Sequence, residues 1–175
     1  AGHETTVNLI SKGILALLRH PRQLKLLRSH PELMPAAVEE LVRYDSPVQM
    51  VSRWAYEDFE IDGKIIKRGD SVGLILGSAN RDEERFENPD ELNFEREALK
   101  HSGFGSGIHF CLGSSLARAE VTIALNTLIN RLPNLTLKED SIEWANNIVF
   151  HGPKHLQIGF RSPRDDKGLW GHDHV

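Results

Sequence analysis

The chain has 175 residues, 39% of them hydrophobic and 26% charged, with a formal net charge of −4 and one cysteine. This composition predicts a single folded domain and excludes a disordered chain or an internal disulfide. It also lacks the basic footprint of nucleic-acid binding and any apolar run of membrane-spanning length. Because a lone thiol suits a reducing compartment, we expect a cytoplasmic protein.

Three helices are expected first, over residues 2–19, 22–29 and 35–44. In the first of them, apolar residues recur at helical spacing (Val7, Ile10, Ile14 and Leu17). Pro21 and Pro47 mark the ends of the first and third helices, since the residue before a proline leaves the helical region. The first helix starts abruptly, so we expect the chain to be part of a longer protein.

Strands follow, over residues 50–55, 58–61, 64–67 and 71–76. The Asp62-Gly63 pair between the second and third is typical of a tight hairpin. Residues 77–107 then show little periodicity beyond a short helical turn at 78–81. An irregular segment of that length is usually functional or specially held in place.

The last long helix is expected over residues 112–131. Its apolar face would contain Leu116, Ala119, Ile123 and Leu128. Short strands are expected near 135–137, 148–151 and 156–161, before a polar tail over 162–175. The pattern therefore predicts a mainly α fold with small β-sheets, in one domain over residues 1–161.

The only cysteine lies in the glycine-rich segment Phe104-Gly105-Ser106-Gly107-Ile108-His109-Phe110-Cys111-Leu112-Gly113. Glycines let a backbone pass close to a flat molecule, and backbone N–H groups can stabilise a thiolate. Four interpretations are open: a thiolate ligand to haem iron, a zinc site, a nucleophile paired with His109, or a structural cysteine. Zinc needs about four ligands, and this segment offers two.

The pattern Phe104-Gly105-x-Gly107-x-His109-x-Cys111-x-Gly113 resembles the haem-binding signature of bacterial cytochromes P450. The similarity covers about residues 1–161 and implies the C-terminal portion of that fold, with the N-terminal half absent. It implies that Cys111 is the axial ligand to the iron of haem b. Phe104, Gly105 and Gly113 would then lie around the cofactor.

The same resemblance implies that the first helix crosses the opposite haem face. Ala1 and Gly2 would leave room for dioxygen, while Thr5 and Glu4 would deliver protons. The alternative is ordinary polarity, because acidic residues favour helix N-termini. A His-Glu-x-x-His zinc motif fails, since Val7 occupies the position of its second histidine.

Further residues are assigned by the resemblance alone. Arg53 and His109 would bind the haem propionates, although Arg53 is also typical of an exposed strand. Substrate-pocket residues would be Gln49, Met50 and Val51, with Met50 equally suited to fill the core.

Glu40 and Arg43 share one helix face at a spacing of three residues. The resemblance implies a third member, Arg96, and a structural network that holds the irregular segment 77–107 against the third helix.

The resemblance implies a haem-thiolate monooxygenase that hydroxylates a small apolar organic substrate with O₂ and two external electrons. The electrons would come from a ferredoxin or flavodoxin on the cysteine side, with Arg118 and Arg131 as candidate contacts. The missing N-terminal part would be a further partner. A peroxide-driven peroxygenase and a non-catalytic truncated haem-binding fragment are the alternatives, and the substrate stays open.

Overall fold

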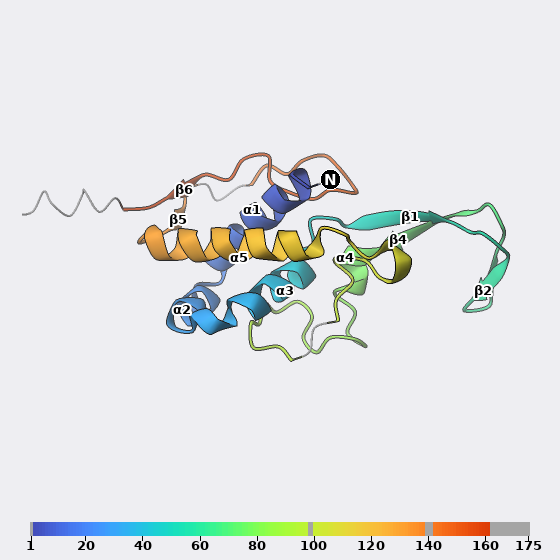
Figure 1. The fold of residues 1–175 in the computed structure, drawn as a ribbon, viewed down its shortest axis with the longest axis horizontal. Coiled ribbons are helices and arrows are strands. Elements are labelled where there is room, and N and C mark those ends of the chain that lie inside the picture. The colour runs from blue at the N-terminus through green and yellow to red at the C-terminus, as the bar shows by residue number, and fades with distance from the viewer. Residues whose placement is uncertain (1, 98–99, 139–141, 162–175) are drawn as a thin grey trace, which may run out of the picture.

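The computed structural model describes residues 2–97, 100–138 and 142–161. Its body is built from α1 (Glu4–Arg19), α3 (Met34–Tyr44) and α5 (Ser114–Arg131), which contact one another. Helix α2 (Pro21–Ser29) and the single turn η1 (Pro31–Leu33) connect α1 to α3. A β arm extends from this helical body (Figure 1). The fold is therefore mainly helical with small antiparallel sheets, as the sequence predicts.

The three long helices meet at Gly13 of α1. A Cβ atom at this position would lie 3.3 Å from Leu41 Cδ1 of α3 and 3.4 Å from Leu125 Cδ2 of α5. The missing side chain thus lets three helices pack closely. The core around this point contains Leu9, Ile14, Leu17, Leu27, Ala37, Val38, Leu41, Val42, Phe94, Val121, Leu125 and Ile129.

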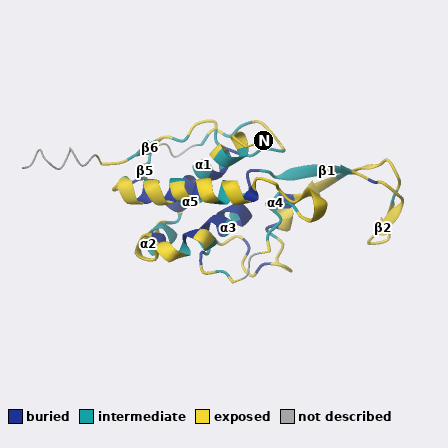
Figure 2. Cartoon of the chain, in the orientation of Figure 1, coloured by how far each residue is buried: buried dark blue, intermediate teal, exposed yellow. Residues whose placement is uncertain are grey.

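The expected apolar face of α5 is wrong. Val121, Leu125 and Ile129 face the core, whereas Leu116 and Ile123 are 61% and 65% exposed. Ala119 is also exposed, and Leu128 is half-buried. Helix α5 carries apolar residues on two sides, so spacing alone does not identify the side that α1 and α3 cover. Figure 2 shows exposed residues alternating with buried ones along it.

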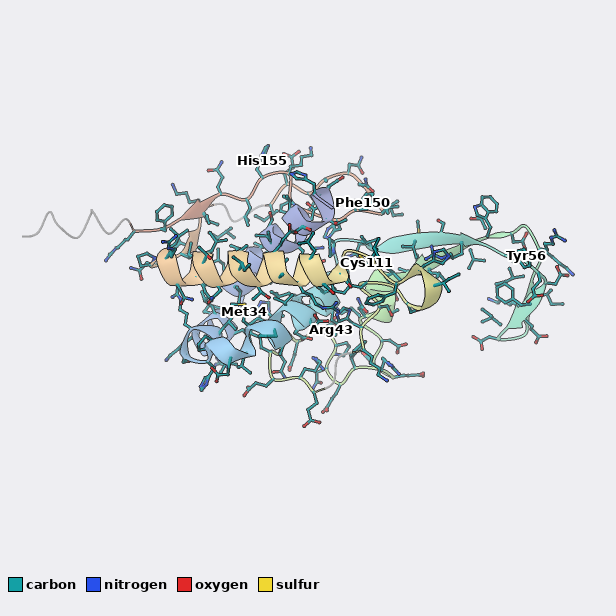
Figure 3. All side chains as sticks on the ribbon, in the orientation of Figure 1. Met34, Arg43, Tyr56, Cys111, Phe150 and His155 are labelled. Atoms are coloured by element: carbon teal, nitrogen blue, oxygen red, sulfur yellow. The ribbon has the colours of Figure 1, made fainter. Side chains whose placement is uncertain are left out.

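The β arm consists of two small antiparallel sheets. Strand β1 (Met50–Trp54) pairs with β4 (Ser71–Ile75), and β2 (Phe59–Ile61) pairs with β3 (Lys64–Ile66). The turn between β2 and β3 has positive φ at both Asp62 (47°) and Gly63 (73°), as the hairpin signal requires. Tyr56, near the far end of the arm, is 88% exposed (Figure 3).

The C-terminal strands are shorter than expected. Strand β5 (Thr136–Leu137) pairs with β6 (Ile158–Gly159). The strand expected over 148–151 is reduced to one bridge, between Phe150 and Val48. The polar tail expected over 162–175 lies outside the described residues.

Residues 77–97 and 100–107 are irregular apart from α4 (Leu76–Ala79) and the start of the 3₁₀ turn η2 (Gly107–His109). In the view of Figure 1 much of this segment lies below α3 and α4. Among the helices in the described part of the chain, none combines the length and the hydropathy needed to cross a membrane.

Candidate functional site

One pocket brings together residues that lie far apart in the chain, from Gly2 to Glu120. Its cavity has a volume of about 260 Å³. Residues from the start of α1, the β1 region, the cysteine segment and the start of α5 form its walls. The lining consists of Gly2, Thr5, Thr6, Leu9, Pro47, Val48, Val51, Arg53, Leu76, Gly103, Phe104, Gly105, His109, Cys111, Gly113, Leu116, Ala117 and Glu120.

Cys111 lies in this pocket as an exposed free thiol. Its segment folds back on itself, because the Cys111 N–H donates to the Phe104 carbonyl at 2.9 Å. Gly105 and Gly107 adopt φ of 71° and 62°, which favours glycine at both positions. The expected helix over 112–131 begins instead at Ser114, so Cys111 immediately precedes the N-terminus of α5 (Figure 3).

A charged cluster supports the cysteine segment. Glu39 accepts hydrogen bonds from Arg118 Nε and Nη2 at 2.5 and 2.9 Å. His101 Nε2 lies 3.1 Å from the same carboxylate. The Arg118 guanidinium also lies over the Phe104 ring, 4.4 Å from its centre. These contacts attach Phe104 and the start of α5 to α3.

The cluster changes the acidity of its members. Burial alone raises the pKa of Glu39, but the hydrogen bonds and charges of Arg118 and His101 outweigh it and lower that pKa to about 2. The hydrogen bond to Glu39 raises the pKa of Arg118, helped by the charges of Glu39 and Cys111. Arg118 was expected as a redox-partner contact, and its guanidinium is already paired within the chain.

The first turn of α1 supplies Thr5 to the same pocket as the cysteine segment. Glu4 is exposed and is not among the lining residues. Gly2 lines the pocket but precedes the helix, with φ of 81°, so the expected helical start at residue 2 is wrong. Ala1 lies outside the described residues.

The expected propionate ligands and substrate-pocket residues divide into two groups. Arg53, His109 and Val51 line the pocket. The Gln49 side chain lies elsewhere, where its Nε2 donates to the Ser46 carbonyl at 2.7 Å. Met50 packs against β4, with Sδ close to Gly73. Of the three residues expected at the substrate, only Val51 is in the lining.

The structure brings Glu40, Arg43 and Arg96 together. Arg43 donates to both Glu40 carboxylate oxygens, from Nε at 2.7 Å and from Nη2 at 2.9 Å, and both side chains are fully buried. Arg96 Nε contacts Glu40 Oε1 at 3.3 Å. Arg43 also donates to the carbonyls of Asn80, Pro89 and Glu91. Together these contacts hold the irregular segment against α3.

Several lining residues were not expected from the sequence. Leu116, Ala117 and Glu120 have the spacing of one helix face on the pocket side of α5, which explains why Leu116 is not in the core. Gly113, which was expected near the cofactor, lines the pocket just before α5. Leu9, Pro47, Val48 and Leu76 add apolar surface. The repeat on α5 is visible in the sequence, but it looks the same as a core-facing stripe.

The donor set fits a haem. Cys111 offers a soft anionic ligand, Arg53 and His109 offer partners for carboxylates, and open space surrounds Gly113, where an added Cβ would meet nothing within 4 Å. The described residues contain no group of three His, Cys, Asp or Glu side chains able to hold a metal ion. The zinc interpretation therefore has no ligand set in that part of the chain.

Comparison with known proteins decides the family. The family profile "Cytochrome P450" matches residues 1–158. The chain belongs to the cytochrome P450 family. The P450 chain is 53% identical over 150 residues to the biotin biosynthesis cytochrome P450 of Bacillus subtilis, covering 86% of this chain and 38% of that protein. It is 44% identical over 168 residues to the cytochrome P450 monooxygenase PikC of Streptomyces venezuelae, covering 94% and 40%.

Solved P450 structures superpose well on the chain. P450BioI in complex with an acyl carrier protein ligated to hexadec-9Z-enoic acid aligns with a TM-score of 0.89 and 49% identity, over 91% of this chain and 42% of that one. CYP109E1 of Bacillus megaterium in complex with testosterone aligns with a TM-score of 0.89 and 40% identity, over 93% and 45%. The chain therefore spans about two fifths of the length of its P450 relatives.

Proposed function

We propose that the chain is the C-terminal, haem-binding part of a haem-thiolate monooxygenase. The observation that carries the proposal is one pocket with the exposed thiol of Cys111 on one side and Thr5 of α1 on another. The intact protein would insert one oxygen atom of O₂ into an apolar organic substrate and reduce the other to water. Two electrons would come from a separate ferredoxin or flavodoxin.

Each residue has a role set by its chemistry. Haem b, when bound, would supply the activation of dioxygen. Cys111 would ligate the iron, and the N-terminus of α5 would stabilise its negative charge. Arg53 and His109 would bind the two carboxylates of the cofactor. Phe104, held under Arg118, would exclude water from the sulfur.

On the α1 side, the Thr5 hydroxyl would accept a hydrogen bond from water and pass a proton into the pocket. Glu4 would exchange protons with solvent from its exposed position. Leu9, Val48 and Val51 would place an apolar substrate beside Thr5 and exclude bulk water.

Relatives support only the broad substrate class. One relative is named for biotin biosynthesis, one structure carries testosterone, and one holds a fatty acyl group on a carrier protein. Testosterone and the fatty acyl group share an apolar carbon skeleton. We therefore propose an apolar organic substrate for the intact protein and name no particular compound.

The remaining partners rest on surface properties. Leu112 and Ile123 of the α5 region and Trp54 of β1 are exposed apolar residues, which supports further chain packing on this part as in the longer relatives. Arg131, exposed at the end of α5, stays a candidate contact for the electron donor. A cytoplasmic location stays a prediction.

The deciding experiment compares the natural protein that carries this chain with its Cys111→Ala variant. Reduction with dithionite under CO should give a Soret band at the thiolate position in the unaltered protein and none in the variant. Glu60→Gln, at an exposed position of β2 outside the pocket lining, is the control and should keep the band. A thiolate band that persists without Cys111 would refute the proposal.

Two alternatives are separated by the oxidant. If turnover is faster with NADPH and a redox partner than with H₂O₂, the result supports the monooxygenase. If turnover is faster with H₂O₂, it supports a peroxygenase. A thiolate band without turnover under either condition supports a non-catalytic haem-binding fragment.

A further inference from the structure

A second charged cluster lies near the pocket, centred on the buried lysine of α1. Lys12 is 3% exposed and is not in the pocket lining. Its Nζ forms an ion pair with Asp45 Oδ1 at 2.6 Å and donates to the Ser46 carbonyl at 2.8 Å. The same atom lies 3.2 Å from the His151 carbonyl and 3.1 Å from His151 Nδ1. A buried ammonium is tolerated only when it is paired in this way.

These contacts join three separate parts of the chain. Lys12 belongs to α1, Asp45 and Ser46 directly follow α3, and His151 belongs to the segment before β6. The Trp144 ring stacks on the His151 ring, with their centres 4.3 Å apart. The backbone at Gly152 also lies against Asn8, because a Cβ at Gly152 would approach Asn8 Oδ1 to 2.2 Å.

Two of the joined parts are pocket walls. Thr5, Leu9 and Lys12 share one face of α1, since they are spaced by four and three residues. Lys12 lies about 10 Å along the helix from Thr5. Asp45 and Ser46 lead directly into Pro47 and Val48, which line the pocket together with Thr5 and Leu9.

The third part, which contains His151, holds the Pro47–Val48 wall in place through backbone hydrogen bonds. His151 N–H donates to the Pro47 carbonyl at 2.8 Å, and Gln49 N–H donates to the Val149 carbonyl at 2.8 Å. The Lys12 ammonium thus contacts the same backbone that these two hydrogen bonds hold in place.

We propose that Lys12 is a positioning residue that sets the spacing between Thr5 on α1 and the Pro47–Val48 wall. The inference rests on the proposed function, because the spacing matters for an apolar molecule bound over the haem beside Thr5. Lys12 touches neither the pocket nor the reacting atoms, so it acts only through the two walls.

The test uses Lys12→Met in the natural, haem-loaded protein, because Met has a similar length and no charge. Binding of two iron-coordinating probes is followed by the shift of the Soret band. Phenylimidazole carries a ring large enough to contact both walls, whereas imidazole does not. Lys154→Met is the matched control, because Lys154 is ion-paired with Glu143 on the surface of the same C-terminal region.

Lys12→Met should weaken phenylimidazole binding about tenfold and imidazole binding less than about twofold, a difference that a shifted wall explains. Lys154→Met should change neither affinity. Asp45→Asn keeps the side-chain shape and the half-exposed position. It should also weaken phenylimidazole binding more than imidazole binding, by a smaller factor than Lys12→Met. It serves as the second variant if Lys12→Met fails to fold.

The inference is overturned if the Lys12 and Asp45 variants lower the melting temperature but affect both probes equally or not at all. That result would leave Lys12 with a stabilising role only. Absence of the thiolate band in the unaltered protein would instead refute the proposed function, and the role of Lys12 with it. A normal band with unchanged probe selectivity would refute the role of Lys12 alone.

Discussion

The buried carboxylate of Glu40 offers a sharp test of what holds the irregular segment. In Glu40→Gln the shape is kept, but the fully buried Arg43 guanidinium loses its anionic partner. The carboxylate also accepts from Arg96 Nε and from the Asn93 N–H at 3.0 Å, so one change weakens contacts on two sides of the segment.

The expected loss follows from the contacts that remain. Removing one member of a buried ion pair costs about 3–5 kcal/mol. Arg43 keeps three backbone carbonyls as acceptors, which favours the lower end, about 3 kcal/mol. The total free energy of unfolding of a protein is typically about 5–15 kcal/mol. A loss of about 3 kcal/mol would lower the ratio of folded to unfolded protein roughly hundredfold.

The assay is urea unfolding of the natural protein, with limited proteolysis to locate the opening. Glu40→Gln should lower the urea midpoint and expose cleavage sites within residues 80–97. Lys67→Met is the matched control, because the Lys67–Asp58 pair is exposed and should leave the midpoint unchanged. A loss below about 1 kcal/mol in Glu40→Gln would refute the reasoning, because an ordinary point mutation already costs about that much.

Three further outcomes test the site. The folded pKa of Glu39, about 2, lies below its ordinary 4.5, so its stabilisation is present above pH 4.5 and lost as pH falls toward 2. The difference in unfolding free energy between wild type and Glu39→Gln should therefore shrink across that window, and a constant difference would contradict the ion pair. Gly103→Ala would place a Cβ 2.4 Å from Val42 Cγ1 and should cost about 1–3 kcal/mol by thermal unfolding. Gly113→Ala meets no protein atom within 4 Å and should keep stability while weakening haem binding in titrations, so unchanged haem affinity would argue against this pocket.

The sequence predicts well where a local pattern decides the structure. The Asp62-Gly63 hairpin forms because both residues adopt positive φ, and Pro21 begins α2 directly after α1 ends. The glycine-rich segment around Cys111 and the pocket position of Thr5 also follow from motifs with fixed spacing. These features depend on a few neighbouring residues.

The failures come from packing between distant segments. The core side of α5 depends on α1 and α3, and Leu116 and Val121 are equally apolar in the sequence. Gln49 precedes the pocket residue Val51, yet its side chain is turned away by Ser46. Nothing in the local sequence predicts that Lys12 is buried, because its partner His151 lies 139 residues further along the chain.

The tight packing at Gly13 has a consequence for mutational studies of this protein. Helix α1 carries Thr5 and helix α5 follows Cys111, and the two helices approach each other where Gly13 meets Leu125. A larger residue at Gly13 would separate α1 from α5 and change the width of the pocket that Thr5 and Cys111 both line. Substitutions in this part of the core would then alter ligand binding, although Gly13 is not among the lining residues.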